Sequence, residues 1–259
     1  MFRFVITLLG FAAFSITSFG DTTVKTSTIV TEGGQRHQGT RYVYYRRGAM
    51  RRRESVDSKG TPSIATIANC ETRSGFFIDL NAREYRTYKV VNFLSDAQLA
   101  EYLKQHPSNA VPVESSTVDT GERKTFFGHS AKHFITTIKR APSKGNGGGE
   151  ESIDGWYIDH ERPDNNCAPD YTANQLSYLL PTGLVTYPDV PQFHHTGPLP
   201  SGLAIKLVHT IKFAGSEGNA SDQPFTTEEN VEDLVDAPVQ PSLFELPSGF
   251  HENPQLFRK

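Results

Sequence analysis

Residues 203–213, with the sequence LAIKLVHTIKF, carry the clearest structural signal in the chain. Apolar side chains alternate there with polar ones. One face takes Leu203, Ile205, Leu207, Ile211 and Phe213, and the other takes Lys206, Thr210 and Lys212. A period of two residues is that of a β-strand, and apolar–polar alternation is typical of antiparallel sheets with one wet face. The stretch therefore predicts an antiparallel strand whose apolar face is buried.

The same strand signals recur through most of the chain and are separated by turn-forming glycines. The Arg-rich residues 50–54 are interpreted as a turn between strands. A long succession of short strands predicts a mainly antiparallel sheet. Besides 203–213, strands are predicted at 24–31, 41–46, 63–68, 76–80, 84–91, 132–139 and 156–159.

One amphipathic helix interrupts the predicted strands. Ser95 and Gln98 form a capping box, and Pro107 ends the helix. Between them lies an apolar stripe of Leu99, Tyr102 and Leu103. A second, shorter helix is predicted over 172–181. A helix with one apolar stripe must bury that stripe against the sheet, so we expect an α+β fold with one or two helices packed on it.

Residues 1–20 have the layout of a cleavable export signal. Arg3 provides a basic start, residues 4–14 are apolar, and small residues precede the cleavage point. The apolar run is too short for a stable membrane-spanning helix; a retained N-terminal anchor is the alternative. We predict a signal peptide, a mature N-terminus at Asp21, and a periplasmic or secreted protein with no stable membrane span.

The charges of the chain are nearly balanced but segregated. Without the signal peptide the chain has 25 basic and 29 acidic side chains, a net charge of −4, which argues against nucleic acid as a partner. Arginines concentrate in residues 36–53, whereas residues 214–257 hold nine acidic side chains and no Lys or Arg. We expect these two regions to lie near each other in the folded chain; an arginine patch that faces an anion or a membrane is the alternative.

The chain has two cysteines, Cys70 and Cys167. An oxidising compartment allows them to form a disulfide. That bond would close a loop of about 98 residues and stabilise the fold by roughly 4–5 kcal/mol. We predict the pairing, with two unpaired thiols as the alternative.

No motif in the chain predicts catalysis, a metal or a cofactor. His129 and His133 have the spacing of a helical metal pair, but they fall in a predicted strand, where residues four apart lie about 13 Å apart. Lys132 stands where a nucleophile elbow needs its second glycine. The glycine-rich residues 144–149 lack the ending of a phosphate loop, and His209 is interpreted as a core-edge histidine with a hydrogen-bond partner. We predict a protein that is not an enzyme and that holds no metal or cofactor.

The order of several short motifs resembles a known family. After the export signal come Met50–Glu54, Asp79–Tyr85, Asp119–Lys124, Phe127–Phe134, Trp156–Asp159, Leu203–Ile205 and Leu243–Phe250. This order resembles a family of bacterial exported proteins, without an assigned activity, whose fold is like that of the outer-membrane lipoprotein carriers of the LolA/LolB type. The resemblance covers most of residues 24–250.

The resemblance implies a strongly curved antiparallel sheet, an open half-barrel, with the helices packed on its concave face. In the carriers that face holds acyl chains. This chain departs from them in its cysteine pair and in its Gly-rich (144–149) and Pro-rich (181–200) loops. Residues 21–259 are expected to form a single LolA/LolB-like, β-rich domain.

We therefore expect a non-catalytic binding or carrier protein for an apolar or lipid-like ligand. A closed core built from the same residues is the alternative to a ligand cavity. Two other functions stay open: an envelope interaction or assembly factor that binds a protein partner without a small ligand, and a secreted hydrolase. The strand phase and the helix stripe give the candidate cavity lining, which is Leu99, Tyr102, Leu103, Phe134, Ile138, Ile205, Leu207 and Ile211.

Overall fold

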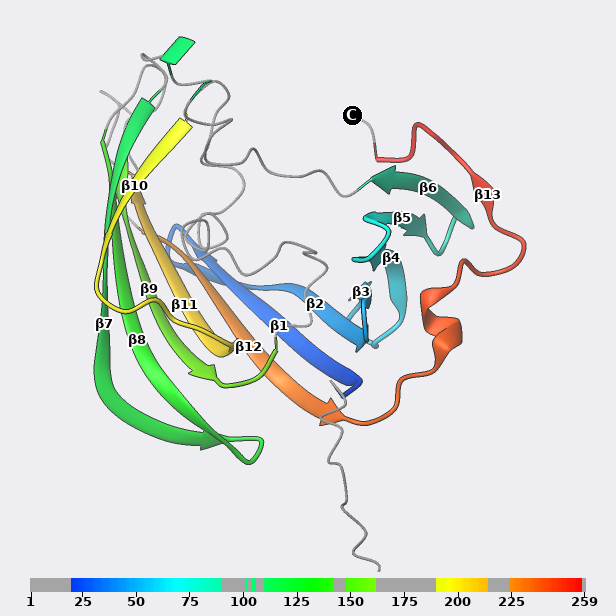
Figure 1. Cartoon of the computed structure of the whole chain (residues 1–259), viewed down its shortest axis with the longest axis horizontal. Helices are drawn as coiled ribbons and strands as arrows, with labels where there is room; N and C mark the ends of the chain where they lie inside the picture. The colour runs from blue at the N-terminus through cyan, green and yellow to red at the C-terminus, as the bar shows by residue number, and fades with distance from the viewer. Residues whose placement is uncertain are drawn as a thin grey trace, which may run out of the picture.

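The computed structural model describes residues 20–89, 101, 104–105, 110–141, 148–161, 190–213 and 224–257. The described residues form one open, strongly curved sheet (Figure 1). Its strands are β1 (Thr22–Glu32), β2 (Gln35–Arg47), β3 (Met50–Val56), β4 (Pro62–Asn69), β5 (Ser74–Asp79), β6 (Glu84–Lys89), β7 (Ala110–Phe126), β8 (His129–Arg140), β9 (Gly149–Ile158), β10 (Val190–Thr196), β11 (Leu203–Phe213), β12 (Phe225–Asp236) and β13 (His251–Glu252).

The order of the strands places the N-terminal strand in the middle of the sheet. The order is β10-β7-β8-β9-β11-β12-β1-β2-β3-β4-β5-β6-β13. All neighbours are antiparallel except at the two edges, where β10 runs parallel to β7 and β13 runs parallel to β6. Because β12 lies between β11 and β1, the acidic and the Arg-rich parts of the chain become neighbours.

The strand predicted at 203–213 is confirmed with the same bounds. Other strands lie where the sequence shows no alternation. Residues 50–54, predicted to be a turn, belong to β3, and part of the Pro-rich segment forms β10. The long strand β7 and the acidic strand β12 were not predicted either. Charged side chains of β12 pair with basic residues of β1 and β2. In β3, Arg52 pairs with Glu54 of the same strand, and Arg51 pairs with Glu161.

The prediction of an α+β fold with one or two helices packed on the concave face is wrong. The part of the chain that the structure describes contains no α-helix packed on the sheet. Within the helix predicted from Ser95, only Glu101, Lys104 and Gln105 are described; they have helical backbone and are exposed. The stripe of Leu99, Tyr102 and Leu103 and the second predicted helix lie outside the described residues.

An extended C-terminal segment, here called the strap, covers strands β4 and β5 on the outer side of the curved sheet (Figure 1). It contains one 3-10 helix, η2 (Pro241–Phe244). Its apolar side chains, which include Phe244, pack on Ile67 and Ile78 of β4 and β5. Arg47 and Arg52 donate hydrogen bonds to the carbonyl oxygens of Val239 and Leu243, at 2.6 and 2.8 Å. The strap therefore buries this face of β4 and β5 and is held by hydrogen bonds to its backbone carbonyl groups.

Two further apolar clusters lie on the strands of the other wing. The larger one contains Val24, Trp156, Ile158 and Ile205, with Tyr44 packed against it. The smaller one contains Val113, Ile138 and Ile153, with Leu207 beside it. No helix among the described residues is long and apolar enough to cross a membrane.

Candidate functional site

The predicted cavity residues divide between two faces of the sheet. Cross-strand pairs place Phe134 with Leu207 through Gly155, and Ile138 with Ile211 through Glu151. These four side chains share one face, which we call the Ile138 face. Phe134, Ile138 and Ile211 are 7%, 0% and 4% exposed, so they are packed as a core.

Ile205 does not lie with them, because β11 contains a bulge. The register between β11 and β9 shifts between Ala204 and Lys206. An inserted residue reverses the side-chain alternation. Ile205 therefore packs with Trp156, whereas Leu207 packs with Ile138. The prediction that the apolar residues of 203–213 share a single face is wrong for this reason.

A buried charged cluster lies on the Ile138 face. The ring of His209 hydrogen-bonds the Glu151 carboxylate (Nε2–Oε2 2.9 Å), and Arg140 lies 3.5 Å from the other carboxylate oxygen. Glu151 is only 4% exposed. The interpretation of His209 as a core-edge histidine with a hydrogen-bond partner is confirmed. The two basic side chains offset the cost of burying the Glu151 carboxylate.

His133, one of the two histidines with metal-pair spacing, belongs to a different polar cluster. It stacks on the single tryptophan, Trp156, with ring centroids 4.6 Å apart and planes 7° apart. Its Nε2 lies 2.8 Å from Asp154 Oδ1, and its Nδ1 lies 3.1 Å from Thr120 Oγ1. Among the described residues no group of His, Cys, Asp and Glu could hold a metal ion.

Thr120, His133 and Asp154 form a hydroxyl–imidazole–carboxylate chain like that of a hydrolase triad, but the oxyanion-binding site of such a triad does not accompany it. A triad needs free backbone N–H groups beside the nucleophile to bind an oxyanion. Here the N–H of Glu122 donates to the Thr120 hydroxyl, and that of Gly121 donates to Asp119. Both amides next to the hydroxyl are occupied, so the geometry favours a structural role.

Most arginines of the Arg-rich segment pair with acidic residues. Arg36 contacts Glu228 at 3.1 Å and Arg41 contacts Glu232 at 2.8 Å, both across the β12–β1–β2 region. The expectation that the basic and acidic regions lie together is confirmed. In the described part of the chain these two pairs neutralise part of the charge of each region.

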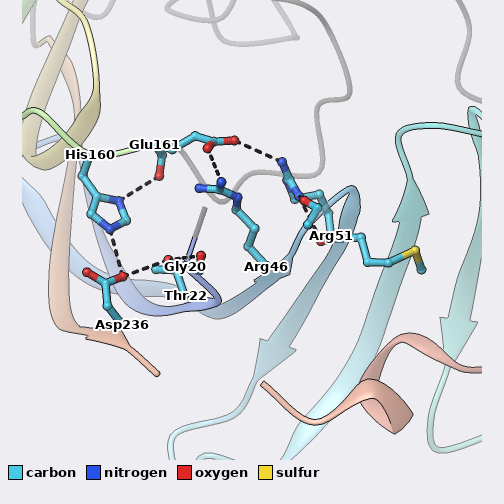
Figure 2. A network of polar contacts seen from close by, with 9 residues as sticks. Gly20, Thr22, Arg46, Arg51, His160, Glu161 and Asp236 are labelled. Atoms are coloured by element: carbon cyan, nitrogen blue, oxygen red, sulfur yellow. Dashed lines mark hydrogen bonds and ion pairs between the residues drawn. The ribbon is translucent and has the colours of Figure 1, made fainter. Parts of the chain in front are cut away.

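A polar network joins the end of β9 to the ends of four other strands (Figure 2). We call this network the clasp; it contains Thr22, Arg46, Arg51, His160, Glu161 and Asp236. His160 and Glu161 lie two and three residues after the last residue of β9, Ile158. Glu161 forms ion pairs with both Arg46 and Arg51, the latter at 3.3 Å. Arg46 of β2 and Arg51 of β3 are cross-strand partners of each other. Two like charges in such a pair repel unless an anion lies between them.

The other half of the clasp reaches β12 and β1. His160 Nε2 lies 3.0 Å from Asp236 Oδ1, and the Thr22 hydroxyl donates to the same oxygen at 2.9 Å. Burial raises the pKa of the Asp236 carboxyl, but the hydrogen bonds from His160 and Thr22 outweigh burial and hold the pKa below its ordinary value. The Arg46 side chain is only 4% exposed, so the clasp is buried where Arg46 joins it.

Beside the clasp, strands β2–β6 present a surface of aromatic rings and arginines that the sequence did not predict. We call it the tyrosine face. The cross-strand pairs form two rows over neighbouring strands. One row is Tyr42, Ser55, Ile64 and Asp79, and the next is Tyr44, Arg53, Thr66, Phe77 and Arg86.

The tyrosine face is open to solvent. Ile64 is 40% exposed, and the rings of Tyr42, Tyr44 and Phe77 are half-buried. Phe77 packs against Tyr88 with ring centroids 4.3 Å apart and planes tilted by 31°. Tyr88 has room for this contact because a Cβ on Gly75 would lie 2.8 Å from its ring. The face therefore combines accessible apolar area with a fixed ring geometry.

The remaining sequence predictions concern residues that the structure does not describe. Cys70 follows β4, and Cys167 lies outside the described residues, so their pairing stays a prediction. Residues 1–19, which include nearly all of the predicted export signal, also lie outside them.

Comparisons with known proteins concern only the overall fold. No family model matches the chain, and no curated protein does. Among solved structures, the chain is similar to an uncharacterized conserved protein from Thermus thermophilus (TM-score 0.39, 7% identity, covering 91% of this chain and 90% of that one). It is also similar to the LolA superfamily protein NE2245 from Nitrosomonas europaea (TM-score 0.31, 8% identity, covering 88% and 90%). The LolA-like resemblance seen in the sequence is thus found again in the fold.

Proposed function

We propose that this chain is an exported, non-catalytic binding protein that holds an apolar or lipid-like ligand against the tyrosine face. The observation that carries the proposal is the set of half-buried rings and the exposed Ile64 on adjacent strands of one sheet face. Ligand sites are typically apolar and aromatic surfaces with a few placed polar groups. The rows from Tyr42 to Arg86 have this composition.

Burial favours the tyrosine face over the Ile138 face as the ligand surface. Covering apolar area stabilises a complex by about 25 cal/mol per Å² removed from water. Phe134, Ile138 and Ile211 are already buried, so a ligand would gain little from contact with them. Tyr42 and Phe77 still expose ring surface, and a ligand that covers them removes it from water. A cavity lined by the residues predicted from the sequence stays a prediction.

The proposal is tested with a nonionic alkyl ligand. Isothermal titration of the chain with decyl maltoside, below its critical micelle concentration, is expected to show saturable binding with one class of sites. Phe77→Ala and Tyr42→Ala each remove one ring from the tyrosine face. Each substitution is expected to weaken the affinity by about tenfold, because one aromatic contact contributes on the order of 1 kcal/mol or more.

Phe127→Ala is the matched control. Phe127 is also an exposed phenylalanine, at 42%, but it lies at the tip of the β7–β8 hairpin. Its removal is expected to leave the affinity unchanged. Absence of saturable binding by the unaltered chain, or equal losses in the Phe127→Ala and Phe77→Ala variants, would overturn the proposal. Native mass spectrometry of the chain from its own host is the independent check, with a stoichiometric apolar adduct expected.

A further inference from the structure

Two arginines on the tyrosine face differ from the other arginines in the strands. Arg36, Arg41, Arg46, Arg51, Arg52, Arg123 and Arg140 each lie within ion-pair distance of a carboxylate. Arg53 and Arg86 have no carboxylate partner in the part of the chain that the structure describes. Each lies over an aromatic ring instead: Arg53 is 5.2 Å from the centroid of Tyr42, and Arg86 is 5.1 Å from that of Phe77.

The sheet register places both guanidinium groups in one row. Arg53 is opposite Thr66, Thr66 is opposite Phe77, and Phe77 is opposite Arg86. Three strand spacings separate the two arginines, about 14 Å along the row. Phe77 lies between them, and Ile64 is one row away. Apolar area is therefore flanked by two cations.

A guanidinium that rests on a ring is suited to bind an anion. Stacking leaves the edge of the guanidinium, with its fork of N–H donors, free to bind a carboxylate or phosphate through two hydrogen bonds. The phenol of Tyr88, which lies against Phe77, does not compete with an anion for Arg53. Burial raises the pKa of Tyr88, and this outweighs the opposite effect of nearby Arg53, so the phenol stays neutral.

The surroundings make Arg53 the stronger of the two cations. Its neighbours on the same face along β3 are Arg51 and Ser55, and the cross-strand partners of Arg53 are uncharged. Arg86, in contrast, shares its face with Glu84 two positions away on β6. That carboxylate weakens the local positive potential at Arg86, so an anion gains more at Arg53.

We infer that the ligand of the tyrosine face is an anionic amphiphile, whose carboxylate or phosphate binds Arg53 while its apolar part covers Ile64 and Phe77. Arg86 positions the Phe77 ring and contributes a weaker attraction. This inference rests on the proposed function, because it names the chemical class of the ligand at the same surface.

The test compares three ligands with the same decyl chain: decanoate, decyl phosphate and decyl maltoside. Isothermal titration at fixed ionic strength is expected to show that an anionic ligand binds the unaltered chain about tenfold more tightly than the nonionic one, as one charge-assisted bidentate contact gives. Whichever of decanoate and decyl phosphate binds with the higher affinity indicates whether the head group is a carboxylate or a phosphate.

Arg53→Gln is expected to abolish this preference, because it weakens the binding of the two anionic ligands more than that of decyl maltoside. Arg86→Gln is expected to reduce the preference less. Arg36→Gln is the matched control, because Arg36 is an exposed strand arginine paired with Glu228, and it is expected to keep the full preference. Equal binding of all three ligands by the unaltered chain, or a preference that survives Arg53→Gln, would overturn the inference while the proposed function stands. If none of the three ligands binds, the proposed function fails as well.

Discussion

At the scale of single residues, the partner of each arginine distinguishes structure from candidate function. Arg46 is almost completely buried and lies against Glu161, and Arg52 is buried against Glu54. Removing one member of a buried pair leaves the other charge desolvated and alone. Arg53 is exposed and rests on a ring, so its removal costs the fold little. Stability measurements can therefore separate the clasp from the tyrosine face.

The clasp gives the first prediction. Glu161→Gln removes the charge that separates Arg46 from Arg51 and is expected to lower the free energy of unfolding by about 1.5–3 kcal/mol, the range for hydrogen bonds to charged groups. The measurement is urea denaturation followed by the fluorescence of Trp156. Arg36→Gln breaks a surface pair and is expected to cost less than about 1 kcal/mol. Similar losses in the two variants would contradict a structural role for the clasp.

The Asp236 carboxyl gives a prediction about pH. Its pKa is lower in the folded chain than in the unfolded chain, so it stabilises the fold above the unfolded value of about 3.9. This contribution is lost as the pH falls through the folded pKa. Asp236→Asn is therefore expected to be less stable than the unaltered chain at pH 6, with the difference disappearing toward pH 2. Urea midpoints measured over that range check it; a difference that stays constant would contradict it.

At the scale of elements, turns and bulges decide which side chains share a face. The bulge in β11 sends Ile205 and Leu207 into different clusters. The β7–β8 hairpin closes through Phe127 and Gly128, which both have positive φ, 50° and 79°. Glycine adopts this conformation freely, whereas a phenylalanine is strained in it. The backbone conformation of Phe127 therefore destabilises the hairpin, and this could not be predicted from the sequence.

Relieving that strain gives the third prediction. Two-residue hairpin turns with positive φ at both positions favour Asn-Gly. Phe127→Asn is expected to raise the free energy of unfolding by about 1 kcal/mol, the lower end of the left-handed backbone cost. Thermal and urea denaturation measure it. Lys132→Asn, in the strand that follows, is the control and is expected to give no gain. A loss of stability in Phe127→Asn would show that its ring contributes more than the strain costs.

At the scale of the whole molecule, contacts outside the strand pairing also hold the open sheet together. The clasp ties β9 to β12, β1, β2 and β3, and the C-terminal strap covers β4 and β5 (Figures 1 and 2). A covalent link between distant segments acts on the same scale, because it restricts the unfolded chain as a whole.

The predicted Cys70–Cys167 disulfide is the fourth prediction. The intact chain, purified without reductant, is expected to be two hydrogen masses lighter than the reduced chain and to resist alkylation. Reduction is expected to lower the free energy of unfolding by roughly 4–5 kcal/mol on the chain-entropy model. A mass that does not change on reduction would show that the thiols are unpaired. Cys70→Ser is the control for nonspecific effects of the reductant, which should not affect its stability.

The sequence by itself determined the features that depend on near neighbours. Alternation over 203–213 predicted β11 with its bounds, and charge segregation predicted that basic and acidic regions would meet. Both patterns can be read from short stretches of the chain, so they can be recognised without knowledge of the fold. Only the tertiary structure decided that the Arg-rich residues 50–54 form a strand, that the bulge divides the apolar face of β11, and that Arg53 rests on the ring of Tyr42. The reason is physical: the register of a sheet and the pairing of its charges depend on residues far away in the chain, which no local pattern specifies.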